Sequence, residues 1–199
     1  MYYLPKNFQT AVEHISQLPA IGPRMAERLV LHLIRYSKSD LQALARSIAN
    51  LSANQLCLRC HNLSDQDLCH ICSDSERDSK TICVVENILD LMAIENKKIY
   101  QGFYHVLGGV IKIGQKDNTH NLKIKELAQR VKKEKPTEVI IATNPTTAGD
   151  LTASLLVDIL KNFPKLKTTR INRGVATGTE LEYADPHSLK ASFQTRQKI

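Results

Sequence analysis

The sequence predicts a multi-domain α/β protein with a helical N-terminal part, a small four-cysteine segment, a parallel-sheet domain and a C-terminal tail that contains a helix. Three observations support this prediction. Apolar residues recur at helical spacing over the first fifty positions, two C-x2-C pairs follow, and short apolar runs then alternate with helical patterns. The expected segments are residues 1–53, 54–76, 77–173 and 174–199.

The composition is typical of a folded protein with a polyanionic partner. Lys and Arg number 27 against 20 Asp and Glu, which gives a net charge of +7. No apolar run approaches the roughly 18 residues that cross a bilayer, and the N-terminus lacks a secretory signal. We therefore expect a cytoplasmic protein with reduced cysteines and no membrane partner. The basic balance favours nucleic acid as a partner, although many basic proteins bind none.

The first segment should form three helices. Phe8, Val12 and Ile15 mark the first helix, and the apolar pattern resumes at Ala26 after an interruption at residues 18–23. A third helix is expected to have Ser39 as its N-cap.

The interruption and the next residue, 18–24, read Leu-Pro-Ala-Ile-Gly-Pro-Arg and resemble the helix-hairpin-helix motif of proteins that bind DNA without reading its sequence. A tight turn before a helix leaves N–H groups free for a phosphate, and the helix dipole favours the same anion. We therefore expect Gly22, Arg24 and Arg28 to bind the DNA backbone. The alternative is a plain helical connection with solvated arginines. The motif usually has glycine in place of Ala20, and alanine would strain a turn that requires positive φ.

Two C-x2-C pairs lie eight residues apart in the second segment and predict a zinc site. They are Cys57, Cys60, Cys69 and Cys72. Four thiolates close the tetrahedral shell that zinc prefers, so we expect one structural Zn²⁺ per chain that helps to fold this segment. The alternatives are a redox pair, plain buried cysteines, or a ligand from His61 or His70. Loss of one ligand should unfold this segment and leave the sheet folded.

The third segment alternates strands with helices, which predicts a parallel sheet covered on both faces. Strands are expected at residues 81–85, 104–107, 139–142 and 168–171, and helices after Asn87 and over 122–133 and 150–163. Cys83 should be a small core residue of the first strand. Residues 73–79 look like a connector and are expected to hold the main domain boundary. In the tail, Asp185 should cap a helix that begins at Pro186.

The first of these strands ends in Val-Val-Glu and resembles the start of the Toprim domain of topoisomerases and primases. Active members add a D-x-D pair that helps to hold magnesium, whereas this chain offers only Asp150 after the later strand. Two lone carboxylates make a poor magnesium site, so we expect no enzymatic activity. Glu86 and Asp150 are then candidate partner-binding residues. The alternative for Glu86 is a carboxylate that bonds local N–H groups at a helix start.

The order of the motifs is similar over essentially the whole chain to that of the bacterial recombination-mediator family RecR. It runs from the hairpin and the four cysteines through Val-Val-Glu and Ala-Thr-Asn-Pro-Thr to Arg-Gly and Leu-Glu-Tyr-Ala-Asp. The resemblance implies a cytoplasmic, nucleoid-associated DNA-repair protein that assembles through its terminal regions into a dimer or a ring-like tetramer. It further implies that this ring encircles DNA and, with RecO or RecF, helps to load RecA at single-stranded gaps.

The chain departs from the family in three places. The family loop T-x-E-G-E is Thr-Thr-Ala-Gly-Asp here, at residues 146–150, which removes one carboxylate from a surface implicated in partner docking. Residues 108–117 replace a segment that is acidic and rich in glycine and proline in the family, and residues 174–179 replace one that is richer in glycine and proline, in a region expected to be an assembly surface. Two other functions stay open: a magnesium-dependent Toprim nuclease or primase that uses Glu86 and Asp150, and a zinc-containing adaptor that binds only proteins.

Overall fold

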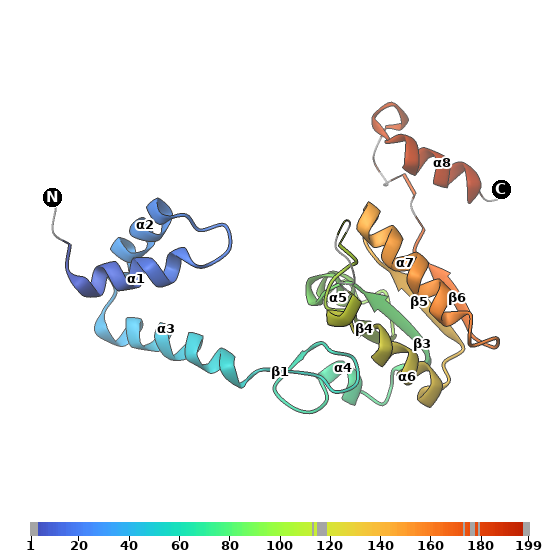
Figure 1. Cartoon of the computed structure of the whole chain (residues 1–199), viewed down its shortest axis with the longest axis horizontal. Helices are drawn as coiled ribbons and strands as arrows, with labels where there is room; N and C mark the ends of the chain where they lie inside the picture. Colours follow the sequence, from blue (N-terminus) through green and yellow to red (C-terminus); the bar gives the residue numbers. More distant parts are fainter. Residues whose placement is uncertain are drawn as a thin grey trace. The chain divides into compact units, whose positions relative to one another are not determined.

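The chain divides into two units, residues 1–54 and 55–199, and each is described by itself. The computed structural model describes residues 4–112, 114, 119–172, 174–175, 178 and 180–196 (Figure 1). Parts of the segments 108–117 and 174–179, in which the sequence departs from the family, therefore lie outside the described residues. Within the described ranges, no helix is both long enough and apolar enough to cross a membrane.

The N-terminal unit contains the three predicted helices. They are α1 (Lys6–Ser16), α2 (Pro23–Leu33) and α3 (Lys38–Asn50), followed by the short 3-10 turn η1 (Leu51–Ala53). Helices α1 and α2 pack through Phe8, Ala26 and Val30, which are buried. Helix α3 buries none of its residues, and its apolar side chains are exposed: Leu41, Leu44 and Ile48.

The predicted cap of α3 is wrong. The N-cap is Ser37, whose side-chain oxygen accepts a hydrogen bond from the backbone N–H of Asp40 at 3.1 Å. Ser39 lies inside the first turn of the helix. Both serines precede the same apolar pattern, so periodicity alone does not choose between them, whereas the bond to the third helical residue does.

The second unit is built around a four-stranded parallel sheet in the order β4-β3-β5-β6. The strands are β3 (Asp78–Val85), β4 (Gly102–Val106), β5 (Glu138–Ala142) and β6 (Lys167–Arg170). The helices between them are α5 (Ile88–Glu95), α6 (Ile124–Glu134) and α7 (Thr147–Leu160), and the 3-10 turn η2 (Thr119–Asn121) precedes α6. The predicted parallel α/β architecture is therefore confirmed.

Alternate residues of the central strand β3 face two different cores. Helices α6 and α7 cover one face of the sheet (Figure 1), and Ile82 and Val84 pack with them. Cys83 and Val85 face the other side, where they pack with α5 and with the four cysteines. The cysteine segment, residues 55–74, is thus part of the sheet's own core, and we call it the knuckle. It contains β1 (Gln55–Leu56), paired with β2 (Leu63–Ser64), and α4 (His70–Ser73).

Residues 73–79 do not form a free connector. Arg77 pairs with Glu95 and donates a hydrogen bond to the backbone oxygen of Gly102 at 3.0 Å, and β3 already begins at Asp78. The chain divides before the knuckle instead, between Asn54 and Gln55. Residues 73–79 thus join the knuckle to the sheet and are tied to α5 and β4.

Two predicted helix starts can be compared with the structure. Asn87 caps α5 in a capping box with Asp90, as expected from the sequence. Helix α7 begins three residues earlier than the predicted Asp150, because the side chain of Thr146 accepts a hydrogen bond from the N–H of Gly149.

The described part of the tail contains η3 (Leu181–Tyr183) and α8 (Pro186–Gln194). Asp185 caps α8 through bonds from the N–H groups of His187 and Ser188, and Pro186 occupies the first helical position. Both features confirm the sequence prediction.

Candidate metal centre and nucleic-acid interface

The knuckle brings the four predicted ligand sulfurs together. The Sγ atoms of Cys57, Cys60, Cys69 and Cys72 all lie within 4.8 Å of one another, and all four residues are buried. The Sγ atoms of Cys60 and Cys69 are 3.5 Å apart. Sulfurs bound to one tetrahedral zinc at about 2.3 Å lie about 3.8 Å from each other, so the observed cluster matches the size of a four-sulfur zinc shell.

Tight backbone turns hold these cysteines in place. The N–H of His61 donates to the Cys57 oxygen at 2.9 Å, and His61 takes the left-handed conformation with φ 60°. The thiols of Cys60 and Cys72 hydrogen-bond to the sulfur of Cys69, which holds the pKa of the Cys69 thiol well below its usual value. The hydrogen bond to Cys69 in turn raises the pKa of the Cys60 thiol, and the pKa of the Cys72 thiol is raised as well, so a metal that binds here must displace protons from the cluster.

The geometry of the knuckle favours a metal site over the alternatives of a redox pair, plain buried cysteines or a histidine ligand. Among the described residues, the four cysteines are the only group of His, Cys, Asp and Glu side chains placed to hold a metal. The ring of His61 packs edge-to-face on His105, and His70 is exposed. All five cysteines are free of disulfides, and Cys83 is buried in the core as predicted.

A second set of contacts joins the knuckle to the sheet. Arg59, between the first two cysteines, lies over the ring of Phe103 at 3.9 Å and forms a two-pronged ion pair with Glu134 at 2.9 and 3.0 Å. The backbone N–H of Val106 in β4 donates to the oxygen of Cys60 at 2.8 Å. Sequence reasoning missed Arg59, because its partners lie 44 and 75 residues away.

The hairpin between α1 and α2 has the geometry of an anion site. Ala20 has φ 64°, which is the positive value that favours glycine at this position. Gly22 is the extended N-cap of α2, no described side chain caps it, and Pro23 follows at the first helical position. The first-turn N–H groups of α2 are therefore open to an external acceptor. Arg24 and Arg28 are exposed one turn apart beside this N-terminus.

The two predicted carboxylates of the sheet domain have different surroundings. Glu86 is buried, and its oxygens accept hydrogen bonds from the backbone N–H and the side-chain amide of Asn144, at 2.6 and 2.8 Å. Asp150 is half exposed and pairs with Arg170 at 2.6 Å. Each carboxylate is therefore engaged by a group of the protein, and they do not belong to a described cluster that could hold a metal.

The loop before α7 depends on residues that sequence reasoning missed. Asn144 links Glu86 to Asp90, whose carboxylate oxygen lies 3.3 Å from the Asn144 amide nitrogen. Gly149 packs so closely that an added Cβ would lie 2.2 Å from the Asn144 oxygen. Any side chain at this position would clash with the backbone of Asn144, which explains why the loop has glycine here. Asp90, Asn144 and Asp150 line a cavity of about 730 Å³ at the carboxyl ends of the strands.

Together, the fold and its sites define a multi-domain α/β protein that combines a helical hairpin with a cysteine metal site. The chain joins a helical hairpin whose second helix has no described side-chain cap, a four-cysteine metal knuckle and a parallel α/β domain whose described carboxylates form no cluster that could hold a metal. Family models match all of these parts: a helix-hairpin-helix of RecR over residues 8–51, a four-cysteine zinc finger domain of RecR over 55–74, a Toprim domain over 80–172 and the C-terminal part of RecR over 174–197.

Relatives over the full length give the same result. The chain is 45% identical to recombination protein RecR of Amoebophilus asiaticus over 197 residues, which cover 98% of each chain. It is 41% identical to recombination protein RecR of Desulfatibacillum aliphaticivorans, again over 98% of each. The protein of the same name from Chloroflexus aggregans is 43% identical over 94% of this chain and 92% of its own. The chain belongs to the RecR family of recombination proteins.

This membership and the sulfur cluster confirm the prediction of one structural zinc. The four cysteines would hold it, and a closed sulfur shell supplies folding free energy and no open position for chemistry.

Proposed function

We propose that this protein is a non-enzymatic DNA clamp of recombinational repair, which acts on the nucleoid in the cytoplasm. In this proposal it assembles into a ring and, with RecO or RecF, helps to load RecA at single-stranded gaps. The observation that carries the proposal is the hairpin, where open N–H groups, a helix N-terminus and two exposed arginines converge on one place.

This arrangement supports binding without sequence reading. Backbone N–H groups and arginines contact phosphate oxygens, which are the same for every base, and such contacts position a protein on DNA. One hairpin makes few contacts and binds weakly. A ring that presents several hairpins to one duplex raises their effective concentration, so modest sites become an adequate grip.

The exposed apolar face of α3 supports self-association. Leu44 and Ile48 of α3 and Leu51 of η1 follow one another at the spacing of one helix face, and they are 36%, 60% and 63% exposed. Apolar surface of this kind is stabilised when a second chain covers it. We therefore propose that assembly involves the N-terminal unit, and we also assign a role to the C-terminal segment, residues 174–199.

The surroundings of the carboxylates support a role without catalysis. A Toprim nuclease or primase requires several free carboxylates around magnesium, whereas Glu86 accepts two bonds from Asn144 and Asp150 pairs with Arg170. Asp150 is the better candidate for direct contact with a partner because 43% of its side chain is exposed. Glu86 would act by holding the loop that carries Asp150.

Binding of the purified protein to a gapped duplex tests this proposal. Fluorescence anisotropy should detect binding without RecO or RecF, and light scattering on the same sample should give a mass above that of one chain. Magnesium should produce neither cleavage nor primer synthesis. Binding that occurs only after a basic partner is added would support the adaptor instead, and a metal-dependent product that disappears in Glu86→Gln would support the enzyme.

A further inference from the structure

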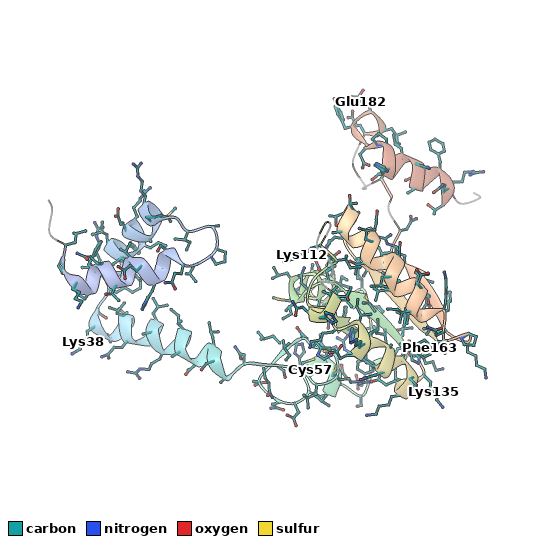
Figure 2. All side chains as sticks on the ribbon, in the orientation of Figure 1. Lys38, Cys57, Lys112, Lys135, Phe163 and Glu182 are labelled. Carbon is teal, nitrogen blue, oxygen red and sulfur yellow. The ribbon has the colours of Figure 1, made fainter. Side chains whose placement is uncertain are left out.

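A groove at the far end of the sheet from these carboxylates is lined by apolar side chains. It lies where α6 and α7 end, and Figure 2 labels Lys135 and Phe163 at this place. Its apolar lining is formed by Val131 and Pro136, at and after the end of α6, and by Phe163 and Leu166, after α7. Phe163 and Leu166 are only partly buried, so each packs on the core with one side and borders the groove with the other.

The groove is large enough for side chains of a partner. Its volume is about 350 Å³. A cavity of about 150 Å³ lined by Leu, Ile and Phe holds benzene, so this groove has room for about two apolar side chains of a bound segment.

The rim of the groove is basic. Lys132, Lys135 and Lys165 line it, all three are exposed, and none of the described lining residues is acidic. Lys132 also offsets the dipole at the C-terminus of α6, which is a sufficient structural reason for one lysine. Lys165 lies outside every helix, so the helix dipoles do not explain it.

Acidic side chains close in sequence to the groove residues have other partners. Glu134, in the last turn of α6, is bound by Arg59 and Arg130. Asp158 pairs with Lys161 at 2.8 Å, and Glu138 lies 3.5 Å from Lys167. The three rim lysines have no ion pair with a described residue. Their positive charge is therefore available to an external anion.

We propose that this groove binds an acidic linear segment of a partner protein, anchored by one or two aromatic or leucine side chains. The apolar lining takes the anchors, and the three lysines attract the flanking carboxylates. The apolar lining favours a peptide over DNA, because a phosphate backbone has no apolar group of this kind to place there. None of the residues that line the groove belongs to the hairpin or to the carboxylate edge of the sheet.

The first test uses a fluorescein-labelled peptide, Gly-Glu-Asp-Phe-Glu-Asp-Leu-Glu-Asp-Gly, with the full-length protein in an anisotropy titration. A matched peptide has alanine in place of Phe and Leu, and a second has lysine in place of the acids. Burial of the two anchors should make the first peptide bind at least about tenfold more tightly than the alanine peptide. Equal binding of these two peptides would overturn the proposal, since charge alone would then explain the signal.

The second test locates the site. Lys132→Glu with Lys165→Glu should weaken binding of the first peptide about tenfold. The control, Lys97→Glu with Lys125→Glu, changes the net charge by the same amount at two exposed positions that do not line the groove. An equal loss in both double variants would contradict the proposal. The single variant Lys165→Glu, in an exposed loop, gives the same comparison if the double variant does not fold.

The remaining occupants are distinguished on the same samples. If an oligothymidylate displaces the peptide and itself loses affinity in Lys165→Glu but not in Lys97→Glu, the groove binds nucleic acid and the proposal is wrong. If Lys165→Glu lowers the light-scattering mass of the free protein, the groove is a contact between copies of this chain, and the proposal is equally wrong.

Discussion

Loss of the zinc ligand Cys57 should destabilise the whole α/β unit and not the knuckle alone. The sequence suggests a small independent domain, but the structure places the four cysteines in one core with Cys83, Val85 and Phe103. Without the metal, the knuckle loses the thiolate cluster that fixes its turns. Its contacts with the sheet should then be lost as well, which couples the metal to the stability of the sheet.

The size of this effect follows from three contacts. The stack of Arg59 on Phe103 contributes about 0.5–1 kcal/mol. The Arg59–Glu134 pair is partly exposed and contributes up to about 1 kcal/mol. The bond from Val106 N–H to the Cys60 oxygen contributes about 1 kcal/mol. Together they amount to at most about 3 kcal/mol, which lowers the melting temperature of a unit of this size by up to about 12 °C.

The assay measures zinc by elemental analysis and unfolding by circular dichroism for Cys57→Ser and the wild type. Cys83→Ala is the control, since it removes a thiol from the same core but leaves the metal shell complete, and it should keep one zinc per chain. A Cys57→Ser protein that has lost its zinc but whose sheet melts at the wild-type temperature would refute the coupling.

Three further predictions address other parts of the chain. Ala20→Gly should raise the free energy of unfolding of the N-terminal unit by about 0.5–1 kcal/mol, because φ is 64° at this position. Hydrogen exchange of the α1 and α2 amides measures this change, and slower exchange in the wild type than in the variant would contradict it. Burial lowers the pKa of His105 to about 3, whereas the pKa in the unfolded chain is about 6.5. Below about pH 6.5 the unfolded chain therefore binds a proton that the folded chain does not, and the free energy of unfolding falls as the pH falls. Wild type should therefore lose about 1.4 kcal/mol in urea unfolding between pH 7.5 and 5.5 that His105→Gln does not lose, and equal losses would disprove this role. Asp150→Ala should weaken binding of RecO or RecF in a pull-down or titration without changing affinity for DNA, and an unchanged partner affinity would remove Asp150 from that surface.

The sequence predicted the elements that depend on local patterns. The four strands are found within a few residues of their expected positions. An unbroken apolar run indicates a strand buried on both faces, as in β3 and β5, whereas the edge strand β6 reads Lys-Thr-Thr-Arg and is only partly buried. Asn87 and Asp185 cap helices as expected because the cap bonds residues two or three positions away. The four metal ligands could also be predicted from the sequence, because the two cysteines of a C-x2-C pair are brought together by the short turn between them.

Contacts between distant residues could not be predicted in this way. Both faces of β3 are apolar, and the pattern does not say that the knuckle covers the face of Cys83. The bonds of Asn144 to Glu86 and of Arg170 to Asp150 likewise join residues 58 and 20 positions apart. These pairs explain why the carboxylates of the sheet do not gather at a metal, and only the structure reveals them.

The proposed DNA clamp depends most on the hairpin as the DNA site, and the salt dependence of binding tests this directly. The measurement compares wild type with Arg24→Gln/Arg28→Gln on one gapped duplex, with Arg35→Gln/Arg46→Gln as a control that removes two exposed arginines of the same unit. Each arginine on a phosphate contributes about 0.9 to the slope of log K against log salt on duplex DNA. The hairpin variant should therefore lose up to about 1.8 in slope for each bound subunit, while the control keeps the wild-type slope. A hairpin variant with the wild-type slope, or an equal loss in the control, would show that the hairpin is not the DNA site.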